Sequence, residues 1–111
     1  MTFIRKKNKT FKWPVLVREP SETDAGVYEE NEFIAIFKRL KVSEYQNAAD
    51  NKSEFELLKM MLQGWENMKE ENGDDIPFNN QNLKDMMEDA YWLRAVSDAY
   101  TKSLMDEKVK N

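Results

Sequence analysis

The side chains that could do chemistry in this chain are mainly carboxylates, because the sequence contains no histidine and no cysteine. Without those residues there is no Ser-His or Cys-His nucleophile pair and no ordinary zinc site. Carboxylates can still transfer protons or bind hard cations. Two groups of acids are close enough in sequence to be considered for such a role: Glu29, Glu30 and Glu32, and then Glu70, Glu71, Asp74 and Asp75.

The spacing of neither acidic group favours a site. Residues 70–75 lack the alternating acids and the closing glutamate of an EF-hand, so a solvated acidic turn around Asn72-Gly73 is the favoured interpretation. Glu29 and Glu30 would point to opposite faces of a strand, and exposure is favoured over the burial that splits the pKa values of an acid–base pair. The sequence therefore predicts no catalytic residue, no metal site and no cofactor.

The elements that surround these acids begin with two predicted strands. Apolar residues alternate from Phe11 to Val17, which is the period of a half-buried strand. Pro14 cannot donate a ladder hydrogen bond, so it favours an edge position or the first residues of the strand. Residues 27–40 form a second strand with apolar side chains on both faces between Phe33 and Phe37. A turn-rich link joins the two, which predicts an antiparallel hairpin.

Helix signals follow the hairpin. Ser43 and Ser53 are candidate N-caps, and an amphipathic helix is predicted after Ser53 as far as Trp65. One kinked helix over residues 43–65 and two short helices both remain open. Further helices are predicted from Asn79 or Asn80 and from about Asp89. The fold class is therefore α+β, with an N-terminal two-stranded antiparallel hairpin packed against three to four C-terminal helices.

Charge is divided unevenly along the chain. The net charge is −4, but residues 1–12 contain five basic side chains and no acid, so the remaining residues carry −9. We expect a flexible basic arm over residues 1–10, a single domain over 11–105 and a frayed tail over 106–111. The acidic domain would repel phosphates, which disfavours a nucleic-acid partner. No apolar run reaches the roughly 20 residues that span a bilayer, so no membrane role is expected.

Methionine and tryptophan supply the candidate partner-binding residues. Met makes adaptable binding surfaces, and of two adjacent Met residues on a helix only one can face the core. We therefore single out Met60 and Met87 from the pairs Met60-Met61 and Met86-Met87, with ordinary core filling as the competing interpretation. Trp13, near a sheet edge, is the third candidate, because exposed aromatics often anchor partners.

One long loop carries the clearest structural signal. Gly64-Trp65 precedes a polar acidic stretch, and Ile76-Pro77-Phe78 follows it. Two large aromatics that flank a solvated loop predict that both of its ends are held against one core.

These landmarks recur in an order and spacing that resemble a known family. They are Lys12-Trp13-Pro14-Val15, Val17-Arg18-Glu19-Pro20, residues 33–38, Ser43-Glu44-Tyr45, Gly64-Trp65-Glu66-Asn67, Gly73, Ile76-Pro77-Phe78, Asn82-Leu83, Tyr91, Arg94-Ala95 and Ala99-Tyr100. Over about residues 11–104 the chain resembles the small tail assembly chaperones of long-tailed bacteriophages and prophages.

The resemblance implies a non-enzymatic role in virion assembly. Such chaperones act in the cytoplasm of the bacterial host, where they bind the tape-measure protein, keep its hydrophobic helices soluble and help to recruit tail-tube subunits. They are absent from the mature virion, and in many phages a ribosomal frameshift adds a C-terminal extension. The family carries no catalytic residues. Self-association is compatible with the sequence, which does not define an oligomeric state.

Three other functions remain open on the sequence. The chain could be an adaptor that the virion retains, which mass spectrometry of purified particles would reveal. It could be a small nucleic-acid-binding regulator that uses the basic arm, in which case its binding would fall steeply with salt. An enzyme that uses carboxylates ranks last and would need a carboxylate with a strongly raised pKa in a deep pocket.

Overall fold

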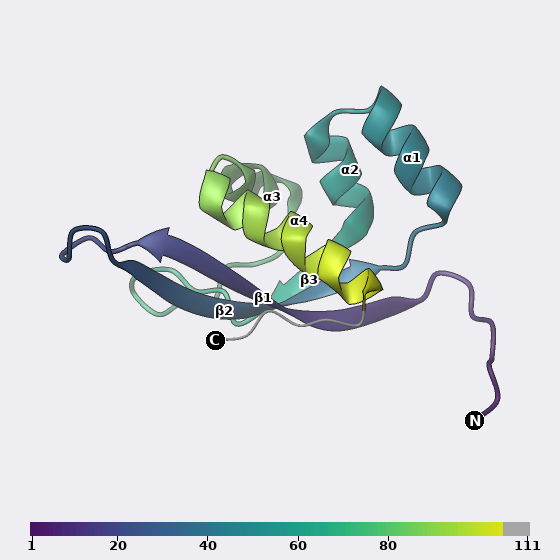
Figure 1. The fold of residues 1–111 in the computed structure, drawn as a ribbon, viewed down its shortest axis with the longest axis horizontal. Helices are drawn as coiled ribbons and strands as arrows, with labels where there is room; N and C mark the ends of the chain where they lie inside the picture. The colour runs from purple at the N-terminus through teal and green to yellow at the C-terminus, as the bar shows by residue number, and fades with distance from the viewer. Residues whose placement is uncertain (106–111) are drawn as a thin grey trace.

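The protein is a three-stranded antiparallel sheet with four helices, as described for residues 1–105 by a computed structural model (Figure 1). The elements in chain order are β1 (Thr10–Pro20), β2 (Tyr28–Lys38), α1 (Val42–Asn51), α2 (Glu54–Met61), β3 (Leu62–Glu66), α3 (Asn80–Met87) and α4 (Ala90–Leu104). The fold class predicted from the sequence is confirmed, including the N-terminal hairpin. The frayed tail predicted over residues 106–111 lies outside the described residues.

The long hairpin forms the base of the domain. β1 pairs with β2 over its whole length, from Thr10 opposite Lys38 to Pro20 opposite Tyr28. β3 pairs with the other edge of β2, which gives the strand order β1-β2-β3. β1 is thus an edge strand, as Pro14 predicts. The β1–β2 turn and the N-terminus lie at opposite ends of the molecule (Figure 1).

The third strand is a correction to the sequence interpretation, which continued a helix to Trp65. The helix ends at Met61, and Leu62–Glu66 is a strand. Gly64 marks the change: a Cβ there would lie 3.2 Å from Cδ1 of Ile36, so glycine lets the two strands approach closely. Glycine also costs a helix about 1 kcal/mol relative to alanine. Leu62 and Trp65 are buried in either conformation, so their spacing alone did not distinguish strand from helix.

Capping side chains fix where three of the four helices begin. The exception is α1, which begins at Val42 after Lys41, so the predicted N-cap at Ser43 is wrong and Ser43 lies inside the first turn. Oγ of Ser53 accepts from the backbone N–H of Glu56 at 3.2 Å, and Oδ1 of Asn79 accepts from that of Asn82 at 2.8 Å. Asp89 caps α4 in the same way. These three predicted helix starts are confirmed, and residues 43–65 hold two separate helices rather than one kinked helix. Within the described part of the chain, no helix is long and apolar enough to cross a membrane.

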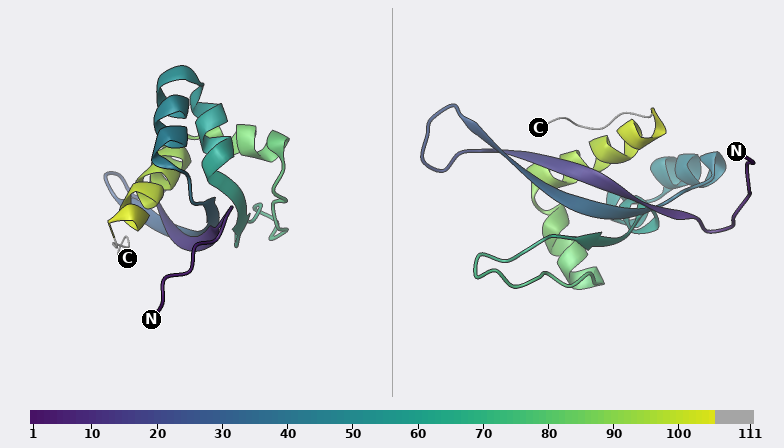
Figure 2. Two further views of the ribbon diagram at one scale, coloured as in Figure 1. Left: turned by 90° about the vertical axis from the view of Figure 1, so that its right-hand side faces the viewer. Right: turned by 90° about the horizontal axis from the view of Figure 1, so that it is seen from below.

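The helices all lie on one side of the sheet and bury its inner face (Figures 1 and 2). α4 crosses β1 and supplies most of the cover. Phe37 is fully buried and meets Tyr100 edge-to-face at a centroid distance of 5.2 Å, while Phe33 stacks on Trp92 at 5.9 Å. Such aromatic pairs add about 0.5–1.5 kcal/mol each beyond the area they bury. The core is therefore built from alternate residues of the strands and one stripe of α4.

The loop after β3 is held at both ends, as its flanking aromatics predict. Nε1 of Trp65 donates to the carbonyl oxygen of Ile76 at 2.7 Å, and the rings of Trp65 and Phe78 meet edge-to-face at 4.8 Å. The acidic turn between them is exposed, and Gly73 adopts a φ of 93°, which suits glycine. The prediction of a solvated turn at Asn72-Gly73 is thus confirmed.

The opposite face of the sheet, which we call the outer face, has no helix over it (Figure 2). Its side chains alternate with those of the core along each strand. They are Lys12, Pro14 and Leu16 on β1, Glu32, Ile34, Ile36 and Lys38 on β2, and Gly64 and Glu66 on β3. Nζ of Lys12 and a carboxylate oxygen of Glu66 are 2.7 Å apart, so one ion pair crosses this face above β2.

Candidate functional site

An open groove separates α4 from α2. A hollow of about 500 Å³ lies between them, lined by Glu54, Ala90, Leu93, Arg94, Ser97, Asp98 and Thr101. A smaller hollow of about 90 Å³ continues it below α1 and α2 and adds Tyr45, Leu57, Leu58 and Met61. The two share Glu54, Leu93, Ser97 and Thr101, so they form one feature, the α2–α4 groove.

The local sequence explains why the helices leave this space. α4 packs mainly on β1 and α3, whereas α2 packs on α1 and the sheet. The row of α4 that faces α2 reads Leu93, Ser97, Thr101, at intervals of four residues. Two of these three side chains are short. The hydroxyl of Thr101 donates to the carbonyl oxygen of Ser97 at 3.1 Å, within α4 itself, and so makes no bond to α2.

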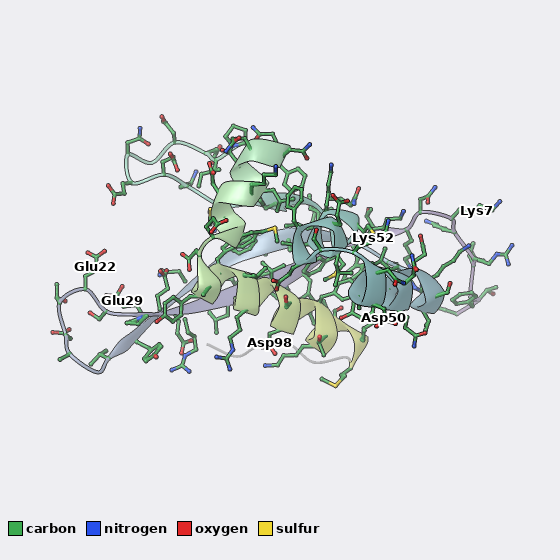
Figure 3. All side chains as sticks on the ribbon, turned by 90° about the horizontal axis from the view of Figure 1, so that it is seen from above. Lys7, Glu22, Glu29, Asp50, Lys52 and Asp98 are labelled. Carbon is green, nitrogen blue, oxygen red and sulfur yellow. The ribbon has the colours of Figure 1, made fainter. Side chains whose placement is uncertain are left out.

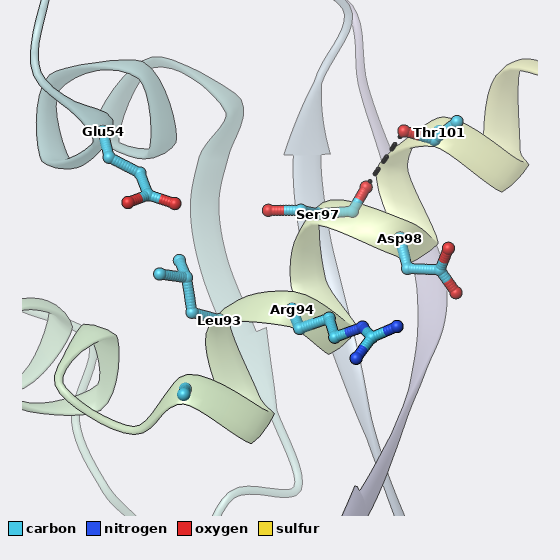
Figure 4. Close-up of a pocket in the computed structure, with 7 residues that line it drawn as sticks. Glu54, Leu93, Arg94, Ser97, Asp98 and Thr101 are labelled. Atoms are coloured by element: carbon cyan, nitrogen blue, oxygen red, sulfur yellow. Dashed lines mark hydrogen bonds between the residues drawn. The ribbon is translucent and has the colours of Figure 1, made fainter.

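The groove has an apolar floor and a charged rim. Leu57, Leu93 and Met61 contribute apolar side chains, all of them packed in or against the core. Glu54 and Leu93 point into the space between α2 and α4, while Arg94 and Asp98 point away from Glu54 (Figure 4). Asp98 forms an ion pair with Lys102 at 3.2 Å. This arrangement offers apolar contact in the centre with charges of both signs around it.

The groove can bind but offers no evident catalytic chemistry. Its hydroxyls belong to Ser97 and Thr101 on the exposed side of α4 and to Tyr45 on α1. The chain contains no histidine or cysteine to activate them. Among residues 1–105, no group of three or more acidic side chains is placed to hold a metal ion. Lys69 and Asp75 of the acidic loop instead pair with each other at 2.6 Å.

The three partner-binding candidates from the sequence lie on three different elements. Trp13 on β1 and Met87 at the end of α3 are partly buried against the core. Met60 on α2 is half-buried and lies outside the core cluster. None of the three lines the α2–α4 groove. The structure therefore does not unite them into one surface.

The methionine pairs behave differently from one another. Met61 is buried and Met60 is not, so the expectation of one core residue in that pair is confirmed. Met86 and Met87 are both partly buried and both pack against the core, whereas we expected one of them to face the core and the other to look sideways or out. α3 ends at Met87 and α4 begins at Ala90, so both sides of that last turn lie against the domain.

Comparison with known proteins adds no relative. No family model, no curated protein and no solved structure matches this chain.

Charge is separated along the length of the molecule. Lys7 of the N-terminal arm lies at one end, and Glu22 and Glu29 of the hairpin lie at the other (Figure 3). The two acids of the hairpin are exposed, as the sequence predicts, and so is Lys7. No charged or polar residue within 1–105 is buried. The charges therefore shape the surface field rather than a buried reaction centre.

Sequence reasoning missed the groove residues because each looked ordinary by itself. The available signal was the row Leu93, Ser97, Thr101, where small polar residues stand at helical spacing next to the buried row of Trp92, Val96 and Ala99. Small residues at such positions leave room beside a helix. The other wall of the groove, on α2, could not be assigned from the sequence because it depends on where β3 returns the chain to the sheet.

Proposed function

We propose that this protein is a tail assembly chaperone of a long-tailed bacteriophage or prophage, which binds the tape-measure protein in the host cytoplasm and leaves before the virion is complete. The proposal is non-enzymatic. It draws on the order of sequence landmarks from Trp13 to Tyr100. The structural observation that supports it best is the α2–α4 groove, a shallow open depression with a few apolar side chains among polar and charged ones.

The groove suits an amphipathic helix as its ligand. A helix that is hydrophobic on one side binds by placing that side in an apolar groove and leaving its polar side in water. Leu57 and Leu93, which are only partly buried, would contact the apolar side. Glu54 and Arg94 would meet polar groups along its edges, so the groove can accept charges of either sign.

Reversible binding is what the dimensions favour. One helix laid in an open groove buries less surface than the roughly 1,200 Å² of a stable complex, and such contacts are weak and transient. A weak contact repeated along a long tape-measure protein would mask its helices collectively. Each copy could then be displaced as the tail-tube subunits arrive. The strongly charged outer surface would keep the assembly in solution.

Co-expression with the tape-measure protein of the same phage or prophage tests the proposal. We expect the two proteins to co-purify and the tape-measure protein to stay soluble only when this chain is present. A tape-measure protein that is equally soluble alone and does not co-purify would contradict the proposal. Mass spectrometry of purified particles should find no trace of this chain, whereas a retained adaptor would be detected.

Two variants on α4 locate the binding surface. Ser97→Arg places a long side chain in the groove from an exposed position, and we expect it to reduce co-purification at least tenfold. Tyr91→Arg makes a comparable change on the same helix at a position 46% exposed and outside the groove, and it should bind like the wild type. Equal binding by both variants would place the tape-measure contact elsewhere on the domain.

A further inference from the structure

The outer face of the sheet carries an ordered sequence of charges along β2. Glu32, Ile34, Ile36 and Lys38 follow each other at alternate positions on that face. Ile34 and Ile36 are partly exposed, because no helix within residues 1–105 covers them. The face therefore has an acidic end, an apolar middle and a basic end.

Along β2, this order of charges is complementary to the same order in a second copy that runs in the opposite direction. Ala35 lies at its centre, with Glu32 three positions to one side and Lys38 three positions to the other. At about 3.3 Å per residue, both charges lie about 10 Å from the centre. A second copy turned end for end would place its Lys38 over Glu32 and its Ile36 over Ile34.

We propose that the outer face binds a second copy of this chain, in a two-fold dimer whose sheets stack face to face with their β2 strands antiparallel. The axis lies between the sheets, perpendicular to the strands and level with Ala35. Such an isologous contact closes after two subunits, because each copy uses the same surface. Sheets stacked in this way lie about 10 Å apart, with apolar side chains between them.

The neighbouring strands support the same arrangement. Pro14 on β1 lies beside Ile34 and extends the apolar middle, whereas Leu16 lies level with Glu32 and is only 8% exposed in the single chain. Gly64 on β3 adds no side chain, so Ile36 can lie over it. The pairs Lys12–Glu66 and Arg18–Glu30 also lie on this face, and each neutralises itself within one copy. That leaves Lys38 and Glu32 as the charges that set the orientation.

The size of the patch predicts a weak dimer. Seven residues of β2 extend about 20 Å, and three strands are about 15 Å wide, so the total buried surface falls below the roughly 1,200 Å² of stable complexes. We expect monomer and dimer to exchange at micromolar concentrations. The α2–α4 groove lies on the other side of the sheet and would stay open in the dimer, so this proposal does not depend on the proposed function.

Charge reversal followed by sedimentation velocity tests the dimer. Glu32→Lys and Lys38→Glu each turn two attractive contacts into repulsive ones, so each should weaken self-association about tenfold. An equimolar mixture of the two variants should recover the wild-type affinity, because the mixed dimer restores both attractive pairs. Glu29→Lys is the matched control, an exposed acid on the same strand outside the patch, and should behave as the wild type.

The mixture of the two variants distinguishes the loss of charge pairing from the unfolding of a variant. If a single substitution merely unfolded the chain, mixing two unfolded variants would not restore the dimer, and thermal unfolding of each variant would reveal it. Three results overturn the proposal: a wild-type chain that stays monomeric at the highest concentration reached, a dimer that either charge reversal leaves unchanged, or a mixture that does not recover.

Discussion

The two faces of the sheet are built from alternate residues of the same strands, yet they follow different rules. The inner face holds Val15, Phe33 and Phe37, which are at most 4% exposed, and it is closed by α4. The outer face holds Ile34 and Ile36, half-buried between charged residues at both ends. The inner face determines whether the chain folds. The outer face mixes apolar and charged side chains and is the surface that the proposed dimer would use.

The largest effect is expected when one side chain on each face of the sheet is truncated to alanine. Phe37→Ala should lower the free energy of unfolding by about 3–5 kcal/mol, because it opens a cavity among fully buried aromatics. Ile36→Ala, at the neighbouring position on the other face, should cost about 1–2 kcal/mol, since its side chain is already partly exposed to water. Urea denaturation measures both. Similar losses at the two positions would show that something covers the outer face of the isolated chain.

A second test compares two buried tryptophans, Trp65 on β3 and Trp92 on α4. Trp65→Phe removes the hydrogen bond to Ile76 and should cost about 1–2 kcal/mol. It should also speed hydrogen exchange of the amides over residues 67–78. Trp92→Phe is the control, because Nε1 of Trp92 is buried without a hydrogen-bond partner among residues 1–105. Its substitution should leave exchange in that loop unchanged, and loss of protection in both variants would argue against the tether.

A smaller effect is expected where the outer face meets β3. Gly64→Ala adds a methyl group 3.2 Å from Cδ1 of Ile36, which must shift to make room. We expect a cost of about 1 kcal/mol in the free energy of unfolding, typical of mild overpacking. Thermal unfolding measures it. A stabilised variant would mean that Ile36 gives way easily and that the reduced entropy of the unfolded chain outweighs the contact.

The smallest effect belongs to the ion pair across the outer face. Lys12 and Glu66 are mostly exposed, so Lys12→Ala should cost less than about 1 kcal/mol, and less still at high salt. Thermal unfolding at two salt concentrations measures it. A larger, salt-independent loss would indicate that the Lys12 stem stabilises the sheet chiefly by covering Ile34 and Ile36.

Much of the domain could be predicted because local signals agree with the final structure. Alternation from Phe11 to Val17 gave the first strand, and Ser53, Asn79 and Asp89 are caps whose geometry is local. β3 could not be separated from α2, because the apolar residues Leu62 and Trp65 fit either period. Its conformation is decided by the free edge of β2, which lies some 30 residues earlier in the chain.

The candidate site was harder to predict for a related reason. The width of the groove is set by the distance between α2 and α4, which depends on how both helices pack on the sheet. Trp13 looked accessible from its position near the edge, but α4 crosses β1 and covers it in part. Two of the three residues chosen for their chemical type, Trp13 and Met87, therefore pack against the core, and residues that seemed unremarkable line the groove.

The cover of β1 by α4 has a consequence for the order of events during translation. The first strand ends at Pro20, but the helix that shields it ends at Leu104. At roughly 5–20 residues per second, about 4–17 seconds pass between the synthesis of one and of the other. During that time the nascent hairpin keeps Trp13, Val15 and Val17 unshielded. A protein that we propose to shield the helices of another protein thus itself exposes an apolar strand while it is being synthesised on the ribosome.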